Sequence, residues 1–113
     1  MSLFCLNRRL RGAALGHFAA FEASSSVPSR RVAAAIERVG LGPTVAAYFD
    51  EHVEADAVHE QVAARDMCGA WVAEHPDRRG DVLFGAAAAL HLDALSAQDL
   101  TGRWAGDGLS AAS

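Results

Sequence analysis

The fold class is decided by residues 43–74, which read PTVAAYFDEHVEADAVHEQVAARDMCGAWVAE. Pro43 suits the first turn of a helix, where the N–H that proline lacks would have no partner in any case. Neither Gly nor Pro follows before Gly69. The run is much longer than the average globular helix of about 11–12 residues. It therefore predicts one long helix, straight or bent.

Two more helices are expected before this one, separated by a break that contains proline. Residues 6–23 carry apolar side chains at helical spacing, and the serines and proline of residues 24–28 are expected to end that helix. A second, short amphipathic helix is expected from Ser29, as its N-cap, to Val39. Gly40 then provides the stop that a helix C-terminus favours.

A fourth helix is expected after Pro76, where apolar residues again recur at helical spacing. No segment shows the sustained alternation of β-branched residues that a strand requires. The sequence therefore predicts an all-α fold, a bundle of about four helices or part of one. Residues 1–105 are expected to form this single domain, and residues 106–113 a flexible tail.

The composition excludes several classes of function. The chain has 113 residues, of which 51% are hydrophobic and 21% charged, as in one ordinary globular domain. Its 14 acidic residues outnumber its 10 basic ones, so its formal net charge is −4 and it carries no electrostatic signature for nucleic acid or anionic lipid. Two isolated cysteines and the absence of a signal-like or membrane-spanning run predict a cytoplasmic protein.

The residues with metal-binding chemistry lie inside the long predicted helix. His52, Asp56 and His59 are spaced by four and then three residues, so their side chains share one helix face within about 60°. Two imidazoles and one carboxylate are the donors of a 2-His-1-carboxylate site, which suits non-haem iron(II), and zinc accepts the same ligands. The alternative is a solvated face, because this helix is acidic throughout.

Glu22 is a fourth candidate ligand. It ends an otherwise apolar run, so its carboxylate is either solvated at a helix end or buried with a partner that meets its charge. If the helices pack as antiparallel neighbours, Glu22 can face His52, Asp56 and His59 and supply a bridging carboxylate, as in helical di-iron sites. Asp66, seven residues after His59, either orients a ligand from behind or is a solvent-exposed carboxylate.

The runs RGAALGHFAAFEASSSVPSRR (residues 11–31) and YFDEHVEADAVHEQVAARDMCGA (residues 48–70) resemble a known family. This family comprises bacterial iron-containing redox enzymes with a haem-oxygenase-like fold, also called haem-oxygenase-like di-iron oxidases. The resemblance extends from about Met1 to Trp104 and is to the C-terminal half of these enzymes. It implies that the expected bundle is the C-terminal half of a haem-oxygenase-like helical domain.

The resemblance also implies a function and a ligand set. Glu22, His52, Asp56 and His59 match positions at which the family binds iron. The family implies a non-haem di-iron cofactor and activation of oxygen. It also implies oxidation of a small organic acid or an amino-acid-like substrate.

The family's remaining ligands lie in the N-terminal half and have no counterpart in this sequence. We therefore expect either a homodimer or a separately encoded N-terminal-half partner to complete the site. The alternatives are a non-catalytic helical interaction module and a truncated, vestigial fragment.

Overall fold

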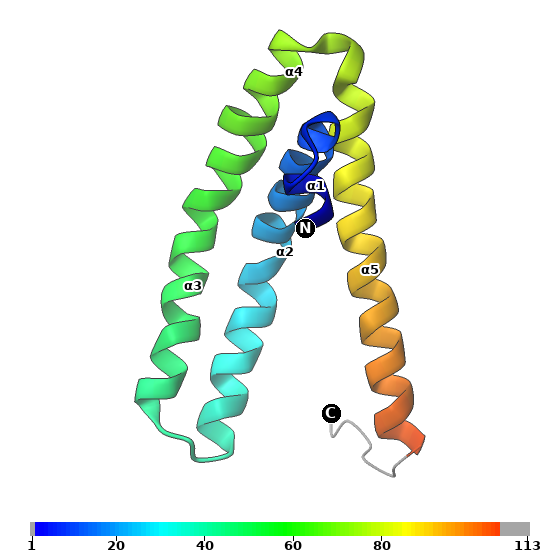
Figure 1. The fold of residues 1–113 in the computed structure, drawn as a ribbon. Helices are drawn as coiled ribbons and strands as arrows, with labels where there is room; N and C mark the ends of the chain where they lie inside the picture. Colours follow the sequence, from blue (N-terminus) through cyan, green and yellow to red (C-terminus); the bar gives the residue numbers. More distant parts are fainter. Residues whose placement is uncertain (1, 107–113) are drawn as a thin grey trace.

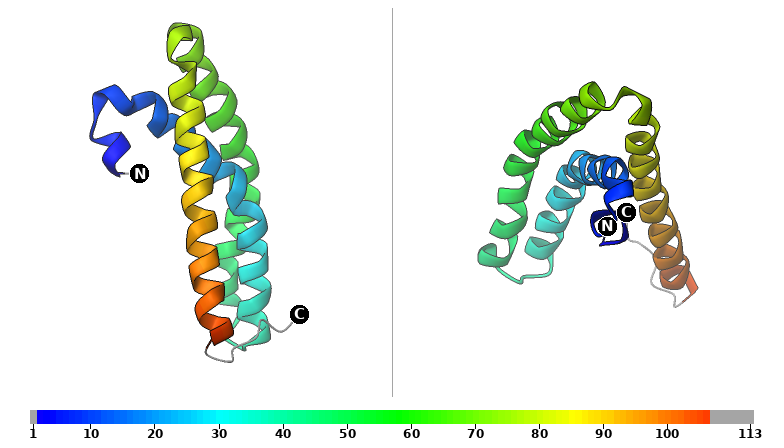
Figure 2. Two further views of the ribbon diagram at one scale, coloured as in Figure 1. Left: turned by 90° about the vertical axis from the view of Figure 1, so that its right-hand side faces the viewer. Right: turned by 45° about the horizontal axis from the view of Figure 1, so that its top comes forward.

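The computed structural model describes residues 2–106, apart from the side chain of Ala57, and in this range it is built from helices. Three long helices determine its shape. The helix α2 (Arg11–Arg38) lies between α3 (Pro43–Gln61) and α5 (Arg79–Gly106), and the segment that follows α3 connects it over the top to α5 (Figures 1 and 2). The all-α prediction is confirmed. The helices in chain order are α1 (Ser2–Cys5), η1 (Arg8–Leu10), α2 (Arg11–Arg38), α3 (Pro43–Gln61), η2 (Val62–Gly69), α4 (Ala70–Glu74), η3 (Pro76–Arg78) and α5 (Arg79–Gly106).

The predicted break at residues 24–28 is wrong, because α2 runs through it with Pro28 inside the helix. Ser29 is therefore an interior residue and not an N-cap. The Ser24 hydroxyl donates to the Ala20 carbonyl at 2.7 Å, within the same helix. Hydroxyls that bond back in this way bend a helix, as does an interior proline, and α2 is visibly bent in the left view of Figure 2. Packing of α2 against α3 and α5 offsets the local cost of Pro28.

The turn from α2 to α3 is the one that the glycines predict. Gly40 and Gly42 both have positive φ, which costs glycine little. The Leu41 N–H donates to the Ile36 carbonyl and the Gly40 N–H to the Glu37 carbonyl, the hydrogen bonds of a Schellman motif. The turn reverses the chain, so α3 returns antiparallel along α2 from its predicted start at Pro43.

The long helix predicted for residues 43–74 is continuous but not uniformly α-helical. Its middle part, Val62–Gly69, is wound as a π-helix, and α4 then completes the path to Glu74. The helix predicted after Pro76 is α5, which begins at Arg79 and ends at Gly106. The remainder of the predicted tail, residues 107–113, lies outside the described part of the chain.

Small residues allow α2 and α5 to pack closely at the end of the molecule that carries α4. Gly16 and Gly85 are buried where these two helices cross, and a Cβ at either one would overlap the backbone of the other helix, at Val82 and Ala13 respectively. Nearer the α2–α3 turn, the buried cluster is Ala33, Ile36 and Ala46, with Phe49 packed against it. The two contacts fix α2 against both of its neighbours.

The distal half of α5 has no comparable packing. Every residue from Leu90 to Gly106 is exposed, and α5 diverges there from α2 (Figure 1). The exposed side chains include four leucines and a tryptophan: Leu90, Leu92, Leu95, Leu100 and Trp104. None of the helices in the described range combines the length and the apolarity needed to cross a bilayer.

Candidate metal centre

Two carboxylates from different helices are buried side by side. Glu22 on α2 is 8% exposed and Asp56 on α3 is 4% exposed. They are separated from the Gly40–Gly42 turn by similar lengths of chain, so antiparallel packing of α2 and α3 brings them to the same level. Burial of a charged group is costly unless a partner compensates its charge, so this pair requires a compensating group.

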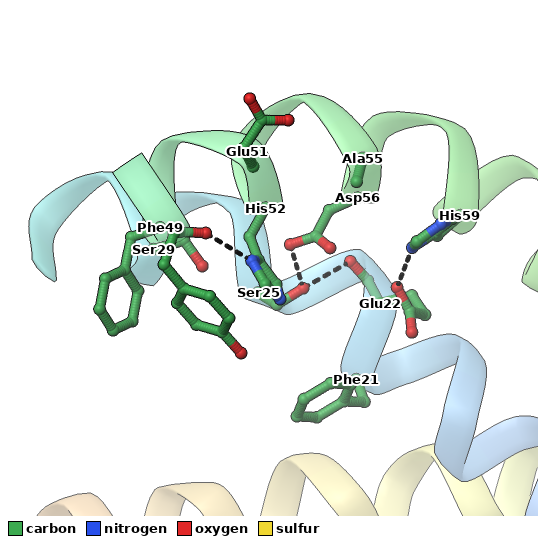
Figure 3. Close-up of a pocket in the computed structure, with 11 residues that line it drawn as sticks. Phe21, Glu22, Ser25, Ser29, Phe49, Glu51, His52, Ala55, Asp56 and His59 are labelled. Atoms are coloured by element: carbon green, nitrogen blue, oxygen red, sulfur yellow. Dashed lines mark hydrogen bonds and ion pairs between the residues drawn. The ribbon is translucent and has the colours of Figure 1, made fainter. Parts of the chain in front are cut away.

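His59 completes a cluster with these two acids. Its Nδ1 atom lies 3.3 Å from Oε2 of Glu22, and its side chain remains 55% exposed (Figure 3). One ligating atom from each of Glu22, Asp56 and His59 can be chosen so that all three lie within 4.8 Å of one another. The structure therefore brings together three of the four residues that the sequence singled out.

His52 lies one turn before Asp56 and is not part of this cluster. Its ring packs on Tyr48, with centroids 4.3 Å apart, and its Nδ1 is 2.6 Å from the Tyr48 carbonyl oxygen. A carbonyl only accepts, so Nδ1 carries the proton and donates it, which leaves Nε2 of the neutral ring with a free lone pair. Ligating histidines are commonly fixed through their other nitrogen in this way.

Ser25 forms a contact that the sequence analysis did not anticipate. Its hydroxyl oxygen lies 2.6 Å from Oδ2 of Asp56 and thereby links α2 to the acidic residue on α3. This serine belongs to the stretch of residues 24–28 that was expected to break the helix. One feature of the sequence pointed to this contact: Ser25 lies three residues after Glu22, and residues three apart share a helix face.

An open cavity of about 640 Å³ lies beside the cluster (Figure 3). Its walls combine aromatic rings, carboxylates, imidazoles and hydroxyls, and they include no lysine or arginine. The lining residues are Phe21, Glu22, Ser25, Ser29, Tyr48, Phe49, Glu51, His52, Ala55, Asp56 and His59. The candidate ligands therefore lie on the wall of a cavity large enough for a small organic molecule.

The donor set fits a divalent metal ion. Within residues 2–106, the only ion pair formed by either buried acid is the one between Glu22 and His59, and no arginine pairs with them. Two carboxylates and an imidazole, with a second imidazole one turn away, are oxygen and nitrogen ligands of the kind that iron(II) and zinc both accept. A bound divalent cation would compensate the two buried negative charges.

The other titratable candidates lie outside this centre. Asp66 is exposed on the π-helical segment. His17 packs edge-on against Phe4, and burial lowers the pKa of its imidazole, with Asp93 acting in the opposite direction. His75 stacks on Trp71. Burial raises the pKa of the Cys68 thiol, which disfavours the thiolate that nucleophilic catalysis would need.

Comparison with known proteins identifies a family for this chain. Residues 1–94 match the family described as iron-containing redox enzymes. Neither a curated protein nor a solved structure matches the chain. The match covers most of the 113 residues and includes all four candidate ligands. The chain thus belongs to the iron-containing redox enzyme family.

Proposed function

We propose that this protein is a non-haem iron-dependent oxidoreductase that activates oxygen at a centre held by Glu22, Asp56 and His59. The observation that carries the proposal is the burial of two carboxylates beside one imidazole, with no arginine partner in the described part of the chain. His52 is the proposed fourth ligand, because its Nδ1–H is already engaged by a carbonyl and its Nε2 is free.

Each ligand has a separate role in this proposal. Glu22 and Asp56 together supply two negative charges, which match the charge of one ferrous ion in a partly buried site. The imidazoles of His52 and His59 supply neutral nitrogen donors from one face of α3. When iron is bound, it supplies the redox chemistry with oxygen, which none of these side chains provides alone.

The cavity supports a small organic substrate. Its volume of about 640 Å³ lies within the usual range for small-molecule sites. Phe21, Tyr48 and Phe49 offer apolar contact, and the Ser29 hydroxyl can hydrogen-bond to a polar group. We therefore propose a small organic acid or amino-acid-like substrate, whose carboxylate would need the metal as its cationic partner because the lining residues include no lysine or arginine.

The number of irons depends on association with a partner. The four donors Glu22, His52, Asp56 and His59 suffice for one ion, whereas the di-iron centre expected from the family resemblance needs further ligands, which we propose another chain supplies. The protein exposes 8117 Å², while a compact monomer of 11.9 kDa exposes about 6,000 Å². Residues 107–113 would contribute on the order of 900 Å² even as an extended chain, less than half of the difference.

We propose a second copy of this chain as that partner. The excess that remains after that contribution is subtracted, about 1,200 Å², lies at the lower end of the range of roughly 1,000–2,500 Å² that each protomer of an obligate homodimer buries. The exposed leucines of α5 are the surface expected to be covered. A separately encoded N-terminal-half partner would leave the chain monomeric or aggregated on its own.

The decisive experiment is an anaerobic titration with ferrous iron that counts irons per chain while the oligomeric state is recorded. We expect tight binding that is abolished by His59→Ala and weakened by Asp56→Asn, with helicity retained. His91→Ala, an exposed histidine on α5, is the matched control and should bind normally. Unchanged binding by His59→Ala would refute the assignment.

The same titration separates the enzyme from the second candidate function. A non-catalytic helical interaction module is favoured by one observation, the exposed apolar side chains of distal α5. Such a module would associate through α5 without binding iron. Stoichiometric iron therefore favours the oxidoreductase, and a dimer without iron favours the module.

A further inference from the structure

Ser25 occupies a special position among three consecutive serines on α2. Its side chain is half-buried, and its Oγ lies 2.6 Å from Oδ2 of Asp56 on the neighbouring helix. The same oxygen is 3.1 Å from the Glu22 carbonyl oxygen. Ser24, by contrast, is exposed, and its hydroxyl bonds only within its own helix, to the Ala20 and Phe21 carbonyls. Ser25 is thus the serine that connects the two helices of the candidate centre.

The hydroxyl has one hydrogen and two acceptors within reach. An ionised carboxylate and a backbone carbonyl can both only accept, so the single O–H bond must favour one of them. Hydrogen bonds to a charged acceptor are shorter and roughly twice as strong as neutral ones, and the contact to Asp56 is the shorter of the two. The hydroxyl therefore donates to Oδ2 of Asp56.

This bond restricts the carboxylate of Asp56. A carboxylate can rotate about its terminal torsion, whose preferences are broad. With Oδ2 held by Ser25, that rotation is limited, and Oδ1 remains free of this bond. Because Ser25 lies one turn after Glu22, a single turn of α2 carries both a buried acid and the hydroxyl that fixes the other acid.

We propose that Ser25 is a positioning residue that orients the Asp56 carboxylate for metal binding. The proposal rests on the proposed function, in which Asp56 is a ligand. Groups that orient ligands typically change metal affinity by about 10–100-fold when they are removed. The role of Ser25 is to hold one oxygen of Asp56.

The test is an anaerobic titration of the full-length chain with Co²⁺, followed by calorimetry and by the visible absorption of the bound ion. Ser25→Ala is expected to lower Co²⁺ affinity about 10–100-fold and to change the Co²⁺ spectrum. Ser25→Thr, which keeps the hydroxyl, should restore both to near wild type. Ser24→Ala, which removes a neighbouring hydroxyl that does not reach Asp56, should leave both unchanged.

The outcomes distinguish this proposal from the proposed function. If the wild-type chain binds no Co²⁺, the metal centre and this proposal both fail. If the wild type binds and Ser25→Ala binds equally well with the same spectrum, only the role of Ser25 is overturned. If Ser25→Ala does not fold, Ser25→Val replaces it, since valine has nearly the shape of the threonine in Ser25→Thr but lacks the hydroxyl. Ser25→Val is expected to show the same loss of affinity relative to Ser25→Thr, and equal affinity of the two variants would overturn the proposal.

Discussion

Replacement of Glu22 by glutamine should make the metal-free protein more stable while it removes metal binding. The two buried acids have carboxylate oxygens no more than 4.8 Å apart. At an effective dielectric constant of about 20, two like charges at that distance repel by about 3.5 kcal/mol. Glutamine has nearly the same shape as glutamate and no charge, so Glu22→Gln removes this repulsion and leaves the packing intact.

The gain is reduced by the loss of the ion pair with His59. That pair is 3.3 Å long but its histidine is 55% exposed, so its contribution is about 0–1 kcal/mol. The net stabilisation of the metal-free protein is therefore about 3 kcal/mol, which corresponds to a rise in Tm of roughly 15 °C for a domain of this size. Ferrous iron should then add little further stability, because a charged ligand is missing.

The assay is thermal unfolding by circular dichroism, with and without anaerobic iron. Glu51→Gln is the matched control, because Glu51 lines the same cavity but is exposed and lies outside the cluster. Its Tm should change little. A lower Tm for metal-free Glu22→Gln would show that Glu22 is a structural partner of His59. A higher Tm with undiminished iron binding would show that Glu22 and Asp56 are neighbours but not ligands.

Two further predictions concern the rest of the fold. Gly85→Ala should destabilise the protein by several kcal/mol or prevent folding, because the added Cβ would overlap the Ala13 backbone. Gly102→Ala is the control on the same helix: it has open space around it and should stabilise the protein by about 0.5–1 kcal/mol. Chemical denaturation measures the free energy of unfolding of both variants. His17 has a lowered pKa, so the unfolded chain binds a proton more readily and stability should fall as the pH drops below the ordinary value of 6.5. His17→Leu should weaken this dependence in unfolding curves measured across that range, and an unchanged slope would contradict it.

The sequence correctly predicted the helix boundaries that depend on the backbone preferences of individual residues. Pro43 and the glycines at 40 and 42 mark a turn wherever they occur, because their backbone preferences are intrinsic. The serines and proline of residues 24–28 carry an equally strong local signal for a break, and that prediction was wrong. Packing of α2 against two neighbours outweighed the local preference, and packing is a property of the assembled helices.

In the candidate site, too, some features follow from the sequence and others only from the packing of the helices. The spacing of His52, Asp56 and His59 was sufficient to place them on one face, because the period of a single helix fixes that relation. The burial of Glu22, its closeness to Asp56 and the hydrogen bond from Ser25 depend on how α2 lies against α3, which sequence periodicity does not encode. The contact of His52 Nδ1 with the Tyr48 carbonyl is local, because the two residues lie four apart on one helix. The sequence by itself thus determined which donors share a helix, and only the tertiary structure decided which of them meet, because convergence requires two helices in a fixed register.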